Sequence, residues 1–274
     1  MLPRYPIYIP SKGRADCCLT GQCFRKDGVP FRLVVEPQER EQYVTEFGAE
    51  SVLVLPFSNL GQGSIPARNW IKDHATAEGH ERHWQFDDNI SGVWRHFRGK
   101  RYYCEAGPAL RAAEDFVDRY TNIAVAGFNY VMFAVECKKP FVTNCHVYSA
   151  TLFWNRLPFR WRGRYNEDTD MCLQVLAAGW CTVLFNAFLV QKLGTMLMKG
   201  GNTETLYRGD GRLKMARSLE RMWPGVVETK RRFNRPQHVI KAAWRKFDTP
   251  LKLKPGVDLS ALPPNEYWLR LEKV

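Results

Sequence analysis

Residues 83–89, His83-Trp84-Gln85-Phe86-Asp87-Asp88-Asn89, join a short apolar run to two carboxylates and an amide. An aromatic-rich run of this length predicts a β-strand, and Asp and Asn directly after it predict a turn. Three similar runs precede it, with helical stretches between them. Buried strands that alternate with helices are typical of an α/β protein with a parallel-rich sheet.

Each of the four predicted strands is followed by a polar loop. The first three strands are expected at Tyr5–Pro10, Phe31–Val35 and Val52–Pro56. In parallel sheets, ligands bind beyond the carboxyl ends of the strands. We therefore expect one edge of the sheet to carry the loops at Ser11–Arg14, Glu36, Asn59–Ser64 and Asp87–Asn89.

The rest of the chain predicts further strands in residues 123–135, 142–153 and 181–189. One helix is expected to open at Ser64-Ile65-Pro66, where Ser is a suitable N-cap and Pro stands in the first turn. Another is expected to open at residues 166–170, Asn-Glu-Asp-Thr-Asp, and to end near Gly179. We expect a catalytic domain over residues 1–205 and a basic, helical or extended segment over residues 206–274.

The net charge is concentrated in that last segment. The 274 residues carry 40 Lys and Arg against 28 Asp and Glu, a formal charge of +12. Residues 212–246 hold eleven of the basic residues and two acids, so this stretch alone contributes +9. Such a concentration indicates a polyanionic partner, which can be a nucleic acid, an anionic lipid or a phosphorylated substrate.

Other sequence features narrow the class of protein. No apolar run approaches the roughly 18–20 residues of a membrane span, and the N-terminus has no signal-peptide core. The eight cysteines show no C-x-x-C spacing, which favours reduced structural thiols over a zinc site or a disulfide framework. We therefore expect a soluble, cytoplasmic protein with no membrane span and no obligate protein partner.

The acidic turn at Asp87, Asp88 and Asn89 is the first candidate for chemistry. Its carboxylate and amide oxygens are the ligands that Mg²⁺ or Mn²⁺ prefers, and they leave coordination sites for phosphate oxygens. The alternative is an ordinary turn, since Asp and Asn favour turns.

The second candidate is the helix start at Glu167, Asp168 and Asp170. Acids in a first turn complement the helix dipole, which is the structural alternative. Three carboxyls this close also repel one another, so one of them can have a raised pKa that suits a general base.

The third candidate is the loop Ser11-Lys12-Gly13-Arg14 together with Arg68, in the first turn of its helix. These residues offer backbone N–H groups and positive charge to a diphosphate. Neither G-x-x-x-x-G-K-[ST] nor G-x-G-x-x-G is present, which argues against a nucleotide kinase and a simple nicotinamide dehydrogenase.

Taken together, the order of these elements resembles a GT-A-fold glycosyltransferase over about residues 5 to 195. The resemblance implies a Rossmann-like mixed sheet flanked by helices, here with a basic C-terminal helical extension. It implies that Asp87, Asp88 and Asn89 stand at the metal-binding D-x-D motif, and that Asp168 is the base of an inverting transfer, with Glu167 and Asp170 as rivals. His238 is the candidate for a C-terminal metal ligand.

A narrower resemblance is to bacteriophage glycosyltransferases related to the base J and TET-associated enzymes. It is carried by four motifs: Ile9-Pro10-Ser11-Lys12-Gly13-Arg14, Phe86-Asp87-Asp88-Asn89-Ile90, the Asn-Glu-Asp-x-Asp helix, and Lys192-Leu193-Gly194-Thr195 followed by Gly200-Gly201-Asn202. It implies transfer of a sugar from a UDP-sugar, with UDP-glucose expected, to the hydroxymethyl group of 5-hydroxymethylcytosine or 5-hydroxymethyluracil in duplex DNA. The donor-binding candidates are Pro10, Ser11, Lys12, Arg14, Glu36, Arg68, Asp87, Gly200 and Gly201.

The basic segment fits a DNA acceptor, because Trp223, Phe233 and Trp244 are interleaved with its charges. An amphipathic basic helix with a solvated face is the structural alternative. The nucleic-acid candidates are Arg160, Arg162, Arg164, Arg231, Arg232, Arg235, Lys241 and Arg245.

Three other functions remain open at this point. The first is a GT-A glycosyltransferase acting on a polysaccharide, lipid or protein. The second is a non-enzymatic DNA-binding α/β protein. The third is a nuclease that uses Asp87, Asp88 and Glu167.

Overall fold

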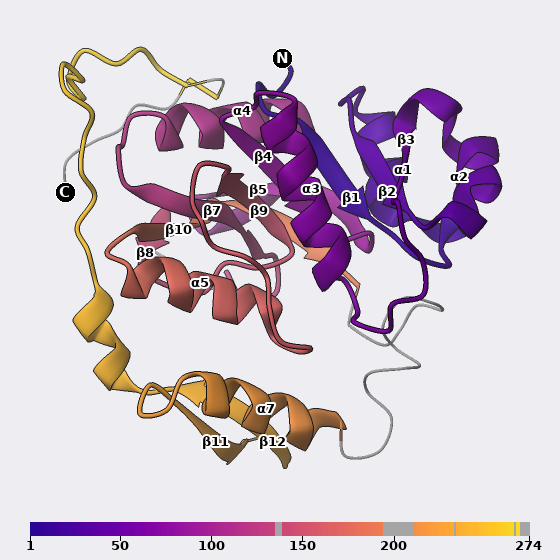
Figure 1. Cartoon of the computed structure of the whole chain (residues 1–274). Coiled ribbons are helices and arrows are strands. Elements are labelled where there is room, and N and C mark those ends of the chain that lie inside the picture. Colours follow the sequence, from indigo (N-terminus) through magenta and orange to yellow (C-terminus); the bar gives the residue numbers. More distant parts are fainter. Residues whose placement is uncertain (135–138, 194–210, 233, 266, 269–274) are drawn as a thin grey trace.

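The computed structural model describes residues 1–134, 139–193, 211–232, 234–265 and 267–268 (Figure 1). Within them a ten-stranded mixed sheet has the order β3-β2-β1-β4-β9-β7-β10-β5-β6, and β8 pairs with β10 beside this path. The strands are β1 (Ile7–Pro10), β2 (Arg32–Val35), β3 (Val52–Val54), β4 (Arg82–Phe86), β5 (Ile90–Phe97), β6 (Lys100–Cys104), β7 (Ile123–Tyr130), β8 (Phe141–Thr143), β9 (Ala150–Trp154) and β10 (Cys181–Lys192).

The directions of the strands create one functional edge. β1 is parallel to β2 and β4, and β2 is parallel to β3. β9 runs antiparallel to both β4 and β7, and β10 is parallel to β7. The carboxyl ends of β1, β2, β3, β4, β7 and β10 therefore point the same way.

Helices cover both faces of this sheet. The helices of the sheet domain are α1 (Leu19–Lys26), α2 (Arg40–Phe47), α3 (Ile65–Ala77), α4 (Ala106–Val117) and α5 (Glu167–Ala177), with short 3-10 turns at η1 (Ala15–Cys17), η2 (Pro37–Glu39) and η3 (Ala49–Ser51). The side chains of Ile7 and Ile9 belong to the core formed with α1, α2 and α4, whereas Tyr8 belongs to the core formed with α3. This alternation follows from the two-residue period of a strand.

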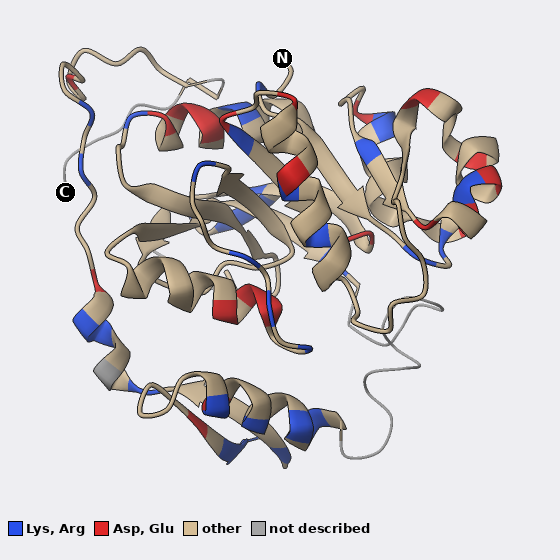
Figure 2. Cartoon of the chain, viewed as in Figure 1, with Lys and Arg blue, Asp and Glu red and all other residues tan. Residues whose placement is uncertain are grey.

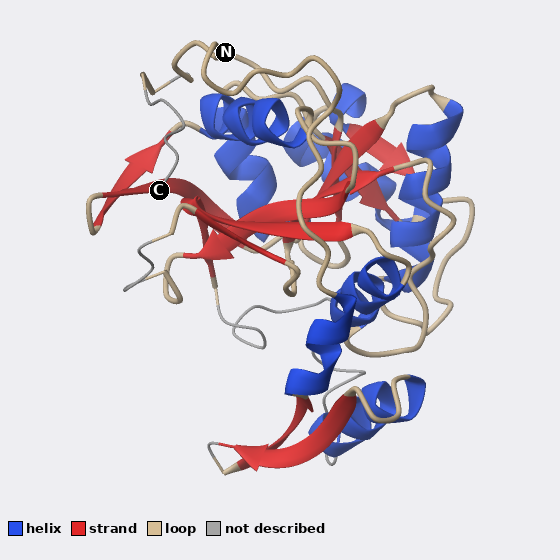
Figure 3. Cartoon of the chain, turned by 90° about the vertical axis from the view of Figure 1, so that its left-hand side faces the viewer, coloured by secondary structure: helices blue, strands red, loops and turns tan. Residues whose placement is uncertain are grey.

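A smaller unit, residues 211–247, follows the sheet domain, and we call it the C-terminal module (Figures 1 and 3). It contains α7 (Gly211–Met222), a two-stranded hairpin of β11 (Val227–Arg232) and β12 (Arg235–Ile240), and the 3-10 turn η4 (Ala242–Phe247). Leu219, Val226 and Val227 form a separate apolar cluster with Leu173 of α5. The module therefore packs on the sheet domain through α5.

The chain after the module, residues 249–253, returns to the sheet domain in an extended conformation, and we call it the strap. The backbone N–H of Thr121 donates to the carbonyl of Lys252 at 2.8 Å, and Asn122 Nδ2 donates to the carbonyl of Pro250 at 2.8 Å. Asn144 Nδ2 also donates to the carbonyl of Thr249 at 2.9 Å. The strap thus fixes the far end of the module to the sheet domain.

The architecture confirms the expected mixed α/β sheet flanked by helices. The other expected strands and both expected helices are present, with shorter or longer ends, whereas the strand expected over residues 142–153 is divided into β8 and β9 by the loop at residues 144–149. The β5–β6 hairpin, α4 and the β11–β12 hairpin were not indicated by the sequence pattern, so the basic extension is only partly helical. All seven cysteines in the described part of the chain are free thiols, and no helix there is long and apolar enough to cross a membrane.

Candidate functional site

The loops after β1, β2 and β3 contact one another at the carboxyl edge. Lys12 Nζ, after β1, donates to Glu36 Oε2, after β2, at 2.7 Å. It also donates to Asn59 Oδ1, in the loop after β3, at 3.0 Å, and the Asn59 backbone N–H donates to Glu36 Oε1 at 3.1 Å. The edge predicted from the strand pattern is confirmed for these loops.

Asp88 anchors the β1 loop from the next strand of the sheet. Ser11 Oγ donates to Asp88 Oδ2 at 2.7 Å, and the Arg14 guanidinium pairs with Asp88 Oδ1. Burial raises the pKa of the Asp88 carboxyl above its ordinary value, although Arg14 and Ser11 oppose this shift. The buried carboxylate of Asp88 therefore holds the loop Ser11–Arg14 in position.

Asp87 accepts hydrogen bonds from three other parts of the chain. Arg68 Nη2 of α3 contacts Asp87 Oδ1 at 2.8 Å, whereas Lys192 Nζ at the end of β10 and Ser149 Oγ before β9 each reach Oδ2 at 2.7 Å. Burial alone would raise the pKa of Asp87, but the charges of Lys192 and Arg68 outweigh it and hold this pKa far below its usual range. Asp87 is therefore an ionised carboxylate with two cationic partners.

The first turn of α5 lies against the same group. Asn166 precedes the helix in the left-handed conformation, at φ 55°, which Asn tolerates better than most residues. Glu167 Oε1 accepts a hydrogen bond from Ser64 Oγ at 2.9 Å and lies 3.6 Å from Arg68 Nε. Burial and the neighbouring charge of Asp168 raise the pKa of Glu167.

Asp168 is held in its charged form by a histidine that the sequence analysis did not single out. Its Oδ2 lies 3.3 Å from His146 Nε2, and its Oδ1 accepts the backbone N–H of Thr169 at 2.7 Å. Burial would raise the pKa of Asp168, but the charge and hydrogen bond of His146 lower it to about 2. Asp168 is therefore ionised at neutral pH.

Asp170 contacts different partners from those of Glu167 and Asp168. It is fully buried, and Arg162 contacts both of its oxygens, at 2.9 Å and 3.1 Å. Trp223 Nε1 of the segment after α7 donates to Asp170 Oδ1 at 2.7 Å. Asp170 thus joins the loop at 156–164 and the C-terminal module to α5, which leaves Asp168 and Glu167 as the candidates for a base.

The acidic turn does not fit a divalent cation as it is arranged here. Both oxygens of Asp87 and both oxygens of Asp88 already accept from cationic or hydroxyl groups. Asn89 Nδ2 donates to the carbonyl of Leu193 at 3.1 Å, and its Oδ1 is buried without a hydrogen-bond partner. Among the residues that the structure describes, no three His, Cys, Asp or Glu side chains form a group that could hold a metal ion.

His238 lies on β12, and the charges that shift its pKa are those of His146 and Asp168. Burial lowers the pKa of His238, the charge of His146 lowers it further, and Asp168 opposes both. The hairpin of the C-terminal module therefore brings a histidine towards the candidate base.

The expected nucleic-acid residues fall into two groups. Arg160 pairs with Asp73 at 2.6 Å, Arg162 pairs with Asp170, and Arg164 lies over the ring of Tyr165 at 5.8 Å. The second group belongs to the module, where Arg231, Arg232, Arg235 and Arg245 are exposed and Lys241 is half-buried. Figure 2 shows basic residues along α7 and the hairpin. Gly200 and Gly201 lie outside the described residues.

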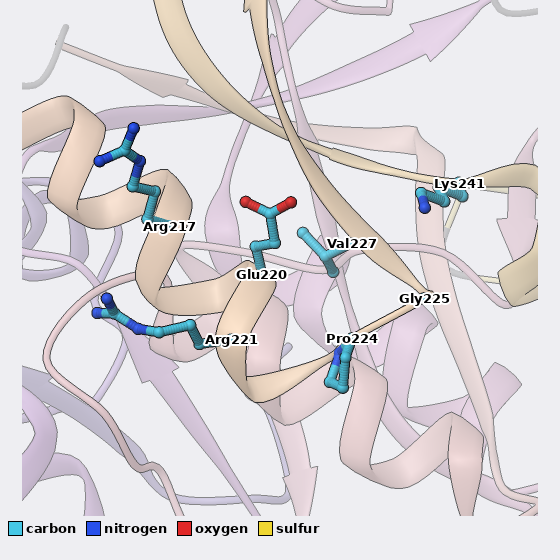
Figure 4. A pocket seen from close by; sticks show the side chains of 7 residues that line it. All are labelled: Arg217, Glu220, Arg221, Pro224, Gly225, Val227 and Lys241. Atoms are coloured by element: carbon cyan, nitrogen blue, oxygen red, sulfur yellow. The ribbon is translucent and has the colours of Figure 1, made fainter.

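The module also contains a cavity of about 470 Å³ beside α7 (Figure 4). Arg217 and Arg221 extend from α7 on one side, and Lys241 lies on the other side. Glu220 lines the cavity as well and accepts a hydrogen bond from Thr229 at 2.7 Å. Three cations and one carboxylate give this cavity a net positive lining.

Residues 5–201 match the sequence profile of the TET-associated glycosyltransferases. The chain belongs to this family. The protein is therefore a glycosyltransferase, as the residue motifs of the carboxyl edge predict. The residues that the sequence analysis left without a role in this glycosyltransferase are Lys192, Ser149 and His146. Of these, only Lys192 could have been found from the sequence, because it stands in the motif Lys192-Leu193-Gly194-Thr195 and lies three residues after the strand predicted at residues 181–189.

No curated protein matches the glycosyltransferase. A solved structure assigned as a nucleotide-diphospho-sugar transferase, from Desulfovibrio desulfuricans G20, is similar to 67% of this chain and 80% of its own, at 12% identity and a TM-score of 0.39.

Proposed function

We propose that this glycosyltransferase moves a sugar, with inversion, from a UDP-sugar to the hydroxymethyl group of 5-hydroxymethylcytosine or 5-hydroxymethyluracil in DNA. The observation that carries the proposal is the shared use of α5. Its first turn carries the ionised Asp168 and contacts Arg68 of the strand edge through Glu167, and the same turn anchors the basic module through Asp170 and Trp223. Donor groups, base and acceptor-binding surface therefore meet at one helix end.

The strand edge supplies what a sugar diphosphate needs. Lys12 and Arg14 follow β1, and Arg68 enters from α3, so three cationic groups, each also paired with a carboxylate, converge where strands of this sheet type bind ligands. Pre-positioned cations stabilise the charge that develops on a departing diphosphate. We propose UDP-glucose as the donor, with Pro10, Ser11 and Glu36 completing its binding surface.

Asp168 is the proposed general base. The acceptor hydroxyl attacks the anomeric carbon from the side opposite the diphosphate, the bond from that carbon to the diphosphate oxygen breaks, and its electron pair leaves with UDP. The hydroxyl proton passes to Asp168, which its lowered pKa of about 2 keeps ionised, while the raised pKa expected of a base belongs to the rival Glu167. A single displacement of this kind inverts the anomeric centre.

The C-terminal module is the proposed acceptor-binding part, within the proposed second unit at residues 206–274. Exposed Arg231, Arg232 and Arg235 suit contacts to DNA phosphates. The positively lined cavity between Arg221 and Lys241 suits a further phosphate. DNA as the acceptor implies that the enzyme works in the cytoplasm of the host cell.

The test is to incubate the protein with a panel of UDP-sugars and duplex DNA that carries hydroxymethylcytosine or hydroxymethyluracil, and then to measure nucleoside masses. We expect one modified nucleoside to gain one hexose, and unmodified DNA to gain none. Transfer to a glycan or lipid extract without transfer to DNA would contradict the proposed acceptor. Nicking of plasmid DNA with Mg²⁺ would indicate a nuclease instead.

A further inference from the structure

Lys192 reaches the acidic turn from a distant part of the chain. It ends β10, which is separated from β4 by β9 and β7 but runs in the same direction as β4. The register between β10 and β5 shifts between Gln191 and Lys192, so that Lys192 pairs with Ile90. An irregularity of this kind re-aims a side chain at the end of a strand.

The ammonium group of Lys192 is held in place by two short contacts. Its Nζ lies 2.7 Å from Asp87 Oδ2 and 2.8 Å from Ser149 Oγ. A third contact, to the hydroxyl of Tyr130, is 3.4 Å long. An ammonium group has three N–H donors, so a phosphate oxygen can replace the long third contact while the two short ones persist.

The charges around Lys192 balance without a further cation. Lys192 and Arg68 pair with Asp87, Arg14 pairs with Asp88, and Arg68 also lies 3.6 Å from Glu167, so three cations face three carboxylates. The exposed fractions of these side chains are 16% for Lys192, 8% for Arg68 and 11% for Arg14. The group therefore needs no further cation to offset its carboxylates, and in this poorly hydrated place the Lys192 ammonium group interacts strongly with a nearby diphosphate oxygen.

A divalent cation on Asp87 would have to displace this ammonium group. Oδ2 of Asp87 already accepts from Lys192 and Ser149, and Oδ1 accepts from Arg68. Displacement would leave a buried cation without its partner, which is unfavourable.

We propose that Lys192 takes the place of a divalent cation: its ammonium group donates to the diphosphate oxygen that receives the electron pair when the sugar–oxygen bond breaks, and transfer needs no added metal ion. The acceptor proton still goes to Asp168. The inference rests on the nucleotide-sugar donor of the proposed function and is independent of the acceptor.

The first measurement is binding of UDP by calorimetry in excess EDTA and in Mn²⁺. We expect wild-type protein to bind UDP equally well, within about twofold, in the two conditions. The Lys192→Met variant should bind UDP about tenfold more weakly, because a charged hydrogen bond is typically worth that much or more. Binding that appears or tightens strongly only with Mn²⁺ would overturn the inference, as would the absence of UDP binding in both conditions.

The second measurement is UDP release from the UDP-sugar under the same two conditions. We expect wild-type rates to be equal in EDTA and Mn²⁺, and Lys192→Met to lose about 10²–10³ in kcat, the range found when one donor to a developing negative charge is removed. Lys26→Met is the matched control, since Lys26 is an exposed lysine on α1. Lys192→Gln serves if the Met variant unfolds, because its amide preserves a donor to Asp87 without the charge.

The two hypotheses fail in different ways. Loss of wild-type activity in EDTA with recovery in Mn²⁺ overturns the role of Lys192 and leaves the DNA acceptor standing. Metal-independent UDP binding and release without sugar transfer to hydroxymethylated DNA supports the role of Lys192 and overturns the proposed acceptor.

Discussion

Trp223 Nε1 donates a hydrogen bond to Oδ1 of Asp170 at 2.7 Å, two residues along α5 from Asp168. The module that we propose to bind DNA is thereby attached to the helix that carries the proposed base. Asn166 Nδ2 adds a second link, to the carbonyl of Met215 at 3.0 Å. Changes in this connection should therefore affect acceptor use before they affect donor binding.

Replacing Trp223 by Phe tests this connection. The variant keeps part of the apolar contact but removes the hydrogen bond to a buried carboxylate, so we expect a loss of about 1.5–3 kcal/mol in the free energy of unfolding by urea. We also expect a higher KM for DNA with unchanged UDP binding. Trp268→Phe is the control, since Trp268 is 86% exposed. An unchanged KM for DNA would show that the link has no role in acceptor binding.

Asp168→Asn tests the base. The amide is nearly the same size as the carboxylate but cannot accept the proton, so we expect kcat to fall by about 10²–10⁴. DNA binding, measured by fluorescence anisotropy, should stay the same. Glu167→Gln is the paired variant because Glu167 lies on the same turn, and full activity of Asp168→Asn with inactive Glu167→Gln would transfer the role to Glu167.

Asp170→Asn should behave in another way. Asp170 is fully buried and bonded to Arg162 and Trp223, so its neutral replacement leaves the guanidinium of Arg162 without its counter-charge. We expect lower stability, by about 1–3 kcal/mol, mainly from the weakened hydrogen bond of the buried carboxylate to Trp223, because the half-exposed Arg162 is solvated by water. Thermal unfolding measures this loss. A variant that keeps wild-type stability but loses all turnover would identify Asp170 as the base instead.

Four cations of the module test the DNA acceptor. We expect the joint replacement of Arg231, Arg232, Arg235 and Arg245 by Gln to weaken DNA binding and to flatten its dependence on salt. If all four contact phosphates, the slope of log K against log salt should shrink by about 3–4. The control replaces four exposed cations outside the module, Lys26, Arg98, Lys100 and Arg101. Equal loss of UDP release in the module variant would contradict the division between donor and acceptor parts.

Glu114 predicts a specific pH dependence of stability. It is fully buried in α4 and accepts from Trp84 Nε1 at 2.8 Å, and burial raises the pKa of its carboxyl to about 7. The folded protein therefore binds a proton more tightly here than the unfolded chain. The contribution of Glu114 is full below the unfolded pKa of about 4.3 and is lost as the pH rises through about 7.

The measurement is the difference in unfolding free energy between wild-type protein and Glu114→Gln at pH 5, 6, 7 and 8. Over this range we expect the stability of the wild-type protein to fall relative to that of the variant. The difference is needed because His83 acts in the opposite direction: burial lowers its pKa to about 4, so its contribution to stability decreases as the pH falls below about 6.5. Glu41→Gln is an exposed control. A constant difference across this range would contradict the role of Glu114.

The sequence was sufficient to predict the carboxyl edge because the relevant residues directly follow their strands. Asp87 follows Phe86 and Ser11 follows Pro10, so strand order and direction alone bring their loops together. The partner of Asp87 was not predictable in this way. Lys192 is 105 residues away, and its contact depends on β9 and β7 lying between β4 and β10.

The roles of the acids on α5 were only partly accessible from the sequence. Asp168 and Asp170 are two residues apart and so point about 200° from each other around a helix, which excludes a shared role. Which of them faces the strand edge depends on the rotation of α5, and the packing of Leu173 and Trp223 determines it. The sequence pattern did not predict the β5–β6 hairpin, because Arg95, His96 and Arg98 interrupt its apolar residues.

The strap at residues 249–253 has a consequence for how acceptors are chosen. Because it returns to Thr121 and Asn122, the module is attached at its C-terminal end as well as through α5, which restricts the motion of its arginines relative to Asp168. If Asp168 is the base, as we propose, this restraint means that an acceptor hydroxyl reaches it only when the backbone carrying that hydroxyl binds at one depth on the module. For the proposed DNA acceptor, we therefore expect target choice to depend on this distance and to need little recognition of the flanking bases.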